Sequence, residues 1–148
     1  MTEPASSPDG GSSPADAAAL LGVKGVVTFF YYDDLASAVA FYERVIGLRK
    51  VLENEWCGLF ELRPGTLLGL VDAVAGSQTP IPGRNKGAIL SIETDRLDAC
   101  LARMKALGLI AQSAGLERGC AGRTWEFKIH DPAGYCLEFF RWIEPPAG

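Results

Sequence analysis

Short apolar runs alternate with two amphipathic stretches along most of the chain. The first run, residues 26–32, is rich in β-branched and aromatic side chains, which predicts a strand buried on both of its faces. A helix is expected directly after it, because Asp33-Asp34 can cap a first turn and apolar residues then recur at helical spacing as far as Gly47. Three further strands are predicted at residues 48–52, 57–62 and 66–71.

The same order of elements repeats in the second half. The pattern predicts a strand at 88–92 and then a second amphipathic helix that ends at Gly108, which lies 61 positions after Gly47. Two copies of a βαβββ unit, each about 60 residues long, account for this repeat. The remaining strands are expected at residues 109–113, 124–129 and 135–142.

Composition separates a folded domain from two tails. Residues 1–23 are mostly Pro, Ser, Gly and Ala, and they offer too little apolar area to offset the entropy lost on ordering, so a disordered tail is expected. The other expected parts are a single domain at 24–144, divided into module one (24–74), a linker rich in Gly and Pro (75–86) and module two (87–144), and a C-terminal tail at 145–148.

Length, charge and cysteine spacing exclude several classes of protein. A chain of 148 residues with 48% apolar residues fits one globular domain. Its net charge of −4 argues against nucleic acid as a partner, because that affinity rests on clustered cations. No apolar run reaches the roughly 18 residues of a membrane span, and the start of the chain lacks the regions of a signal peptide, so we expect a cytoplasmic protein without a membrane partner. The four cysteines form no C-x-x-C pair, which favours buried thiols over zinc or redox chemistry.

Two segments carry a family resemblance. DLASAVAFYERVIGL, at residues 34–48, resembles the first-helix signature of the vicinal oxygen chelate superfamily, which includes glyoxalase I, the bleomycin resistance proteins, fosfomycin-resistance transferases and extradiol dioxygenases. GRTWEF at 122–127, followed by HDPAGYCLE at 130–138, resembles the last hairpin of that superfamily. The resemblance implies an α+β fold of two tandem βαβββ modules that form an open mixed β-sheet cup with the helices outside. It also implies a homodimer.

Most of the metal-ligand positions implied by the resemblance carry residues that cannot bind a metal. In metal-using members, His, Gln or Glu side chains on the first and last strands of each module hold one divalent ion. The corresponding positions in this chain carry Val27, Gly69 and, in module two, Gly87, Ala88 or Ile89. Only the last position, Glu138, has a metal-binding side chain. We therefore expect neither a metal at the usual site nor another cofactor.

Glu138 remains the one candidate catalytic residue. Its carboxylate either pairs with a neighbouring cation or serves in a pocket as a polar anchor or general base. A divalent metal at a non-standard site stays an alternative, with carboxylates and the only histidine as ligands. The candidates for that site are Glu61, Asp72, Glu93, His130 and Glu138.

Aromatic residues on the predicted strands suggest a binding pocket. If the position of Val27 faces the cup, strand alternation turns Phe29 and Tyr31 to the same side. An apolar cavity with a few polar groups is typical of small-molecule sites, although the same rings also suit a core or a dimer interface. The candidate ligand-binding residues are Phe29, Tyr31, Trp56, Phe60, Trp125 and Phe140.

The sequence favours a binding protein and leaves enzymatic activity open. The first hypothesis is a metal-independent protein that binds an aromatic or amphipathic small molecule, similar in kind to the bleomycin resistance subgroup. The second is a lyase, isomerase or dioxygenase of the same superfamily, with a metal at a non-standard site or with acid–base chemistry at Glu138. The third is a structural or regulatory dimer whose cup is filled by its own side chains.

Overall fold

The computed structural model describes residues 19–148. Most of the predicted N-terminal tail, residues 1–18, lies outside the described residues. Among the described residues, no helix is both long and apolar enough to cross a membrane.

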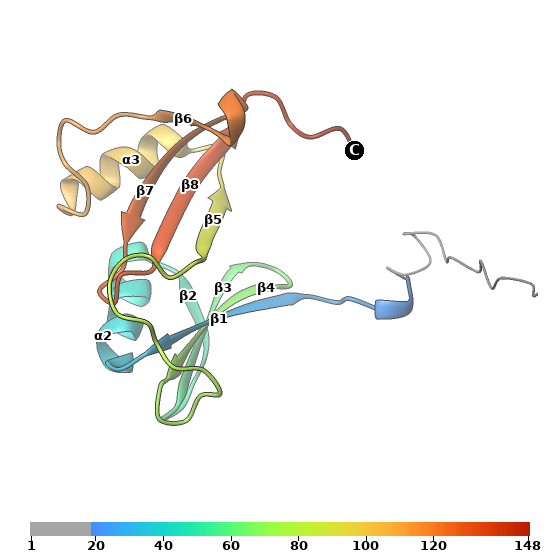
Figure 1. The fold of residues 1–148 in the computed structure, drawn as a ribbon, viewed down its shortest axis with the longest axis vertical. Coiled ribbons are helices and arrows are strands. Elements are labelled where there is room, and N and C mark those ends of the chain that lie inside the picture. Colours follow the sequence, from blue (N-terminus) through green and yellow to red (C-terminus); the bar gives the residue numbers. More distant parts are fainter. Residues whose placement is uncertain (1–18) are drawn as a thin grey trace, which may run out of the picture.

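The chain forms two four-stranded mixed sheets, one from each module, which Figure 1 shows one above the other. Sheet A has the strand order β1-β4-β3-β2, and sheet B has the order β5-β8-β7-β6. In each sheet the first pair is parallel and the other pairs are antiparallel, so the two modules have the same topology. The predicted α+β fold of two βαβββ modules is confirmed.

The elements lie close to their expected positions. Module one consists of β1 (Val26–Tyr32), α2 (Leu35–Ala40), the π-helical turn η1 (Phe41–Ile46), β2 (Arg49–Glu53), β3 (Cys57–Arg63) and β4 (Thr66–Asp72). Module two consists of β5 (Ile89–Glu93), α3 (Leu97–Ala106), β6 (Glu117–Gly119), a short 3-10 turn (Cys120–Gly122), β7 (Thr124–His130) and β8 (Cys136–Trp142). Gly47 and Gly108 both have the positive φ expected of glycines that end helices.

One predicted strand, at 109–113, is wrong. The chain continues from α3 as a loop there, and the short edge strand β6 forms only at Glu117–Gly119. Leu109 and Ile110 pack against the hydrophobic core beneath α3, so their apolar character reflects a loop anchored to the core rather than a strand.

Each sheet buries one face beneath its helix and leaves the other open. In sheet A, Phe30, Tyr32 and Phe60 are buried on the helix side. The expectation that β1 is buried on both faces is wrong, because Val27 and Phe29 are 40% and 47% exposed. The linker covers part of this second face, where Gly76 packs against the Tyr31 ring, but it leaves Val27 and Phe29 exposed.

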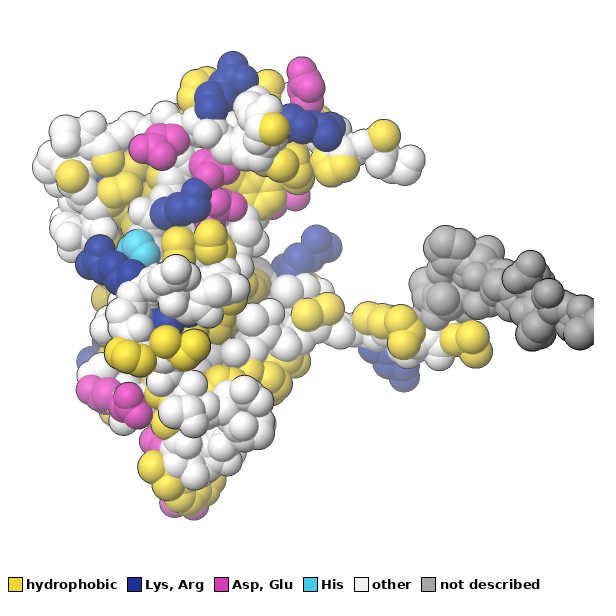
Figure 2. Space-filling model, viewed as in Figure 1, with side chains coloured by type: hydrophobic (Ala, Val, Ile, Leu, Met, Phe, Trp, Pro, Cys, Tyr) yellow, Lys and Arg dark blue, Asp and Glu magenta, His cyan; other side chains and the backbone are white. Residues whose placement is uncertain are grey.

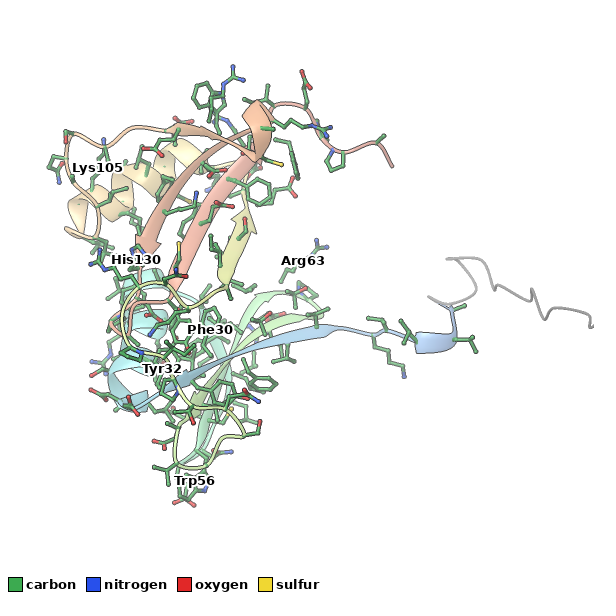
Figure 3. The ribbon with its side chains drawn as sticks, viewed as in Figure 1. Phe30, Tyr32, Trp56, Arg63, Lys105 and His130 are labelled. Carbon is green, nitrogen blue, oxygen red and sulfur yellow. The ribbon has the colours of Figure 1, made fainter. Side chains whose placement is uncertain are left out.

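A buried carboxylate joins the two modules. Asp131, in the turn between β7 and β8, accepts hydrogen bonds from the hydroxyls of Tyr32 (2.6 Å) and Tyr42 (2.9 Å) in module one. Its other oxygen accepts from the backbone N–H groups of Ala133 and Tyr135, which shapes the turn. Figure 3 shows Tyr32 on the module-one side of this junction. One side chain therefore both forms the turn and attaches it to module one.

Tyr135 extends the same junction. Its ring stacks on Phe30 at 4.1 Å between centroids. Its hydroxyl donates to the carbonyl oxygen of Tyr31 (3.0 Å) and accepts from the N–H of Tyr31 (3.1 Å). The turn of module two thus packs against β1 through both apolar and polar contacts.

The buried phenols predict a loss of stability at high pH. Burial raises the pKa of Tyr32 and of Tyr42, and the neighbouring Asp131 raises both further. In the unfolded chain both phenols ionise near pH 10, so the stability they contribute is complete below that pH and is lost as the pH rises above it. The free energy of unfolding should fall by about 1.4 kcal/mol per pH unit for each phenol. Tyrosinate absorbance measured alongside circular dichroism checks this, because ionisation of both phenols in a folded chain would contradict it.

Candidate functional site

The open face of sheet A carries an exposed apolar surface. Phe29 pairs with Gly69 in the β1–β4 register, and Leu59 pairs with Gly69 from the other side. A Cβ atom on Gly69 would overlap the Phe29 ring, so the glycine provides the space in which that ring lies. Val27 shares this face, two residues before Phe29.

This arrangement bears directly on the two metal-ligand positions of module one that the resemblance implies. Val27 has no donor atom, and the Phe29 ring fills the space above Gly69. Among the described residues, no group of three or more His, Cys, Asp or Glu side chains lies close enough together to hold a metal ion. The residues present therefore do not fit a divalent metal at the usual site of the resemblance.

The predicted ligand-binding residues are split between several places. Tyr31 is half-buried, and its ring packs against Gly76 of the linker. Trp56 is 46% exposed in the turn between β2 and β3, which Figure 3 shows at the far tip of sheet A. Phe140 lies on sheet B, where it packs edge-on against Trp142.

Two residues of the predicted ligand-binding set, Phe60 and Trp125, do not lie on an open face. Phe60 has no exposed surface, and its ring lies 6.2 Å from that of Tyr42 in the core. Trp125 packs against the core of module two, with the Arg118 guanidinium 4.8 Å above its ring. Both side chains belong to the helix side of their sheets, because strand alternation turns them away from the open face.

Glu138 belongs to an ion-pair cluster on the open face of sheet B, in which Lys128 pairs with two carboxylates. Its carboxylate pairs with Lys128 at 2.8 Å and accepts a hydrogen bond from the Ser91 hydroxyl at 2.5 Å. Lys128 also pairs with Glu126, which accepts a further hydrogen bond from Thr124 at 2.8 Å. Glu138 is therefore a paired carboxylate, which was one of the two interpretations open from the sequence.

The cluster shifts the pKa values of its members. Burial raises the pKa of Glu126, but the hydrogen bonds from Lys128 and Thr124 outweigh it, so the pKa lies below its usual value. Burial lowers the pKa of Lys128, whereas its bonds to Glu126 and Glu138 raise it by more, so Lys128 remains charged. The lysine thus favours the ionised form of Glu126.

Removing the lysine is expected to raise the pKa of Glu126. In Lys128→Met, burial remains without the cation that opposes it, while the hydrogen bond from Thr124 still lowers the pKa, so the pKa of Glu126 should rise from its wild-type value. In the wild type, the lowered pKa of Glu126 contributes stability that is complete above the usual glutamate pKa and is lost as the pH falls; the variant should lose less stability over the same fall in pH. At neutral pH the free energy of unfolding of Lys128→Met should be about 0.5–1 kcal/mol lower than that of the wild type. The effect is small because solvent screens the charge of a lysine that is 38% exposed.

Carbon-detected NMR titration of the glutamate carboxyls measures that change. Lys50→Met serves as the matched control, because Lys50 also pairs with two carboxylates, Glu43 and Glu53, but on sheet A. It should leave the titration of Glu126 unchanged. An unshifted Glu126 in Lys128→Met would show that the ion pair does not control this carboxylate.

The residues proposed for a non-standard metal site are dispersed. Glu61 pairs with Arg49 on sheet A, whereas Glu93 lies on β5 and His130 at the end of β7 in sheet B. Asp72 ends β4, where its carboxylate accepts a hydrogen bond from the N–H of Val74. They do not converge with Glu138 on one point.

Two cavities were not predicted from the sequence. A cavity of about 530 Å³ lies between the start of α2, the linker and the turn at Pro132-Ala133. A second, of about 510 Å³, lies between residues 84–89 of the linker and β5 and the adjoining ends of β7 and β8. The only sequence signal for either was the Gly- and Pro-rich linker, which is not specific for a site.

Comparisons with known proteins assign the fold. The sequence model described as "Glyoxalase/Bleomycin resistance protein/Dioxygenase superfamily" matches residues 25–139. A comparison with curated protein sequences finds no match.

Several solved structures are similar to this chain. A lactoylglutathione lyase from Agrobacterium tumefaciens is 25% identical, with a TM-score of 0.64 over 78% of this chain and 91% of its own. A glyoxalase/bleomycin resistance protein/dioxygenase from Nocardioides is 19% identical, with a TM-score of 0.64 over 90% and 99% of the two chains. TioX from Micromonospora sp. ML1 is 20% identical, with a TM-score of 0.63 over 80% and 98%.

Proposed function

The chain belongs to the glyoxalase/bleomycin resistance protein/dioxygenase superfamily, and we propose that it is a metal-independent protein that binds an aromatic or amphipathic small molecule. The observation that carries this proposal is the open apolar face of sheet A. Phe29 and Val27 leave 47% and 40% of their surfaces in contact with solvent there. Large exposed apolar side chains grouped on one face are typical of a ligand-binding or interaction surface.

Metal independence is supported by how the Phe29 ring is accommodated. Gly69 stands where the resemblance implies a metal ligand, and the Phe29 ring occupies the space that a side chain at position 69 would need. A glycine at this position therefore provides no metal-binding atom and allows an aromatic ring to lie on the open face. A ligand would stack on Phe29 and contact Val27 and the edge of Tyr31, with affinity derived from apolar burial.

We propose further that two copies form a homodimer around the ligand. Within residues 19–148, no strand of sheet A is hydrogen-bonded to a strand of sheet B. Phe29 and Tyr31 therefore lie on a different sheet from Glu138 and Phe140. If sheet B of a second copy lay opposite sheet A, the aromatic groups and a polar anchor would line the same pocket, as small-molecule sites require.

The likeness to a lactoylglutathione lyase keeps one alternative, an enzyme with Glu138 as its acid–base group. The contacts of Glu138 speak against it. Each oxygen of this carboxylate already has one partner, Ser91 or Lys128, and a group held in an ion pair on the sheet is typical of a structural role. The binding function is accordingly the one we propose.

Native mass spectrometry tests the proposal in one experiment. The purified chain is measured alone and after addition of Zn, Ni, Mn and Fe(II). A dimer that retains no ion is expected. One tightly held ion per chain would overturn metal independence, and a monomer would overturn the proposed dimer.

A further inference from the structure

The second cavity, of about 510 Å³, is lined by basic groups. Arg84, Asn85 and Lys86 contribute from the linker, and His130 contributes from the end of β7. The remaining lining residues are Gly87, Ala88, Ile89 and Cys136. Thus no carboxylate lines this cavity, although the chain as a whole carries a net charge of −4.

The cations of this cavity are not neutralised by the protein. Among the described residues, no ion pair joins Arg84, Lys86 or His130 to a carboxylate. Asp131 follows His130 in sequence, but its two oxygens are bonded to Tyr32, Tyr42 and the backbone of the turn. The carboxylate adjacent to His130 in sequence is thereby engaged elsewhere, and Glu138, on the same face of sheet B as Cys136, is paired with Lys128.

Lys86 is held in place beside the cavity. Its ammonium donates to the carbonyl oxygen of Ile81 and lies 5.1 Å from the centroid of the Tyr135 ring. One such bond leaves two N–H donors of the ammonium for another partner. Ile81 and Tyr135 line a neighbouring cavity, so the Lys86 ammonium lies at the border between that cavity and this one.

His130 lines the same cavity as Arg84, and its pKa is affected by that charge. Burial lowers the pKa of His130, the Arg84 charge lowers it further, and Asp131 opposes them. A neutral imidazole beside a guanidinium offers one N–H donor without adding charge. In Figure 2 the histidine, drawn in cyan, lies against dark-blue basic side chains on the visible face.

We propose that this cavity is an anion site that binds the oxyanion group of a small molecule, a phosphate or a carboxylate. Arg84 would bind two of its oxygens, the geometry that a guanidinium favours, and Lys86 would bind as a point charge. The His130 imidazole adds a hydrogen bond. Arg84 and His130 do not line the neighbouring cavity that contains Phe29 and Tyr31, although Lys86 lines both cavities. The anion site is therefore tested separately from the function proposed for sheet A.

The experiment is a proton NMR titration of the untagged chain, in which His130 is the only histidine. Inorganic phosphate and acetate are added in separate series at constant pH, with sodium chloride at equal ionic strength as the reference. Saturable shifts of the His130 ring signals are expected with at least one oxyanion and not with chloride. The anion with the lower dissociation constant, phosphate or acetate, is the one that the site prefers.

Variants connect the signal to the cavity. Arg84→Gln and Lys86→Gln should each weaken binding by about tenfold, because each removes a charge-assisted contact. Arg63→Gln removes the same charge at the end of β3, which Figure 3 shows away from His130, and should leave binding unchanged. Shifts that chloride reproduces, or equal affinity in all three variants and the wild type, would overturn the proposal.

Discussion

Replacing Asp131 with alanine is expected to destabilise the fold by about 3–5 kcal/mol. The change leaves the buried hydroxyls of Tyr32 and Tyr42 without their acceptor, and each unsatisfied buried group costs about 1–3 kcal/mol. It also removes the acceptor for two backbone N–H groups of the turn. Because the carboxylate joins the modules, the loss acts on their packing as well as on the turn.

Urea denaturation followed by circular dichroism measures that loss, and the melting temperature should fall by roughly 10 °C. Asp131→Asn should cost about half as much, since its amide oxygen still accepts from the turn and its NH₂ group can donate to a phenol oxygen. Asp98→Ala is the matched control, because Asp98 is exposed and its pair with Arg141 contributes little. Equal stabilities of Asp131→Ala and Asp98→Ala would rule out this account of the junction.

Replacing Phe29 with alanine is expected to weaken the binding of an aromatic ligand by about 10- to 100-fold. Burying a side chain of this size contributes about 1.5–3 kcal/mol, and each 1.4 kcal/mol corresponds to a factor of ten in affinity. Nile red is a suitable probe, because it is aromatic and uncharged and therefore has no reason to prefer the basic cavity around Arg84. Its fluorescence on titration with protein gives the dissociation constant directly.

Two further variants make the Phe29 experiment specific. Leu107→Ala is the matched control, because Leu107 is 46% exposed, close to the 47% of Phe29, but lies at the end of α3. Gly69→Ala keeps the ring but displaces it, since the added Cβ would overlap it, and should also weaken binding. If dye affinity dropped in Leu107→Ala and held in Phe29→Ala, sheet A would not be the binding face.

The open faces explain why some site residues were predictable and others were not. The positions of Val27 and Gly69 followed from the family resemblance, and their lack of ligand atoms was visible in the sequence. The sequence did not show which face of the sheet Phe60 and Trp125 occupy. Their neighbours, such as Leu59, give no alternation of apolar and polar residues that would indicate the buried face. In such strands only pairing with the neighbours decides the orientation.

Local patterns were enough to predict the two βαβββ modules, the helix ends at Gly47 and Gly108 and the family, because periodicity, caps and short motifs involve residues close in sequence. The contacts between the modules and the basic cavity could not be predicted in this way. The Tyr32–Asp131 contact joins residues 99 positions apart, and the basic cavity brings Arg84 beside His130. Such contacts arise when the linker and the turn pack against β1 and sheet B, and that packing depends on the whole chain rather than on any local pattern.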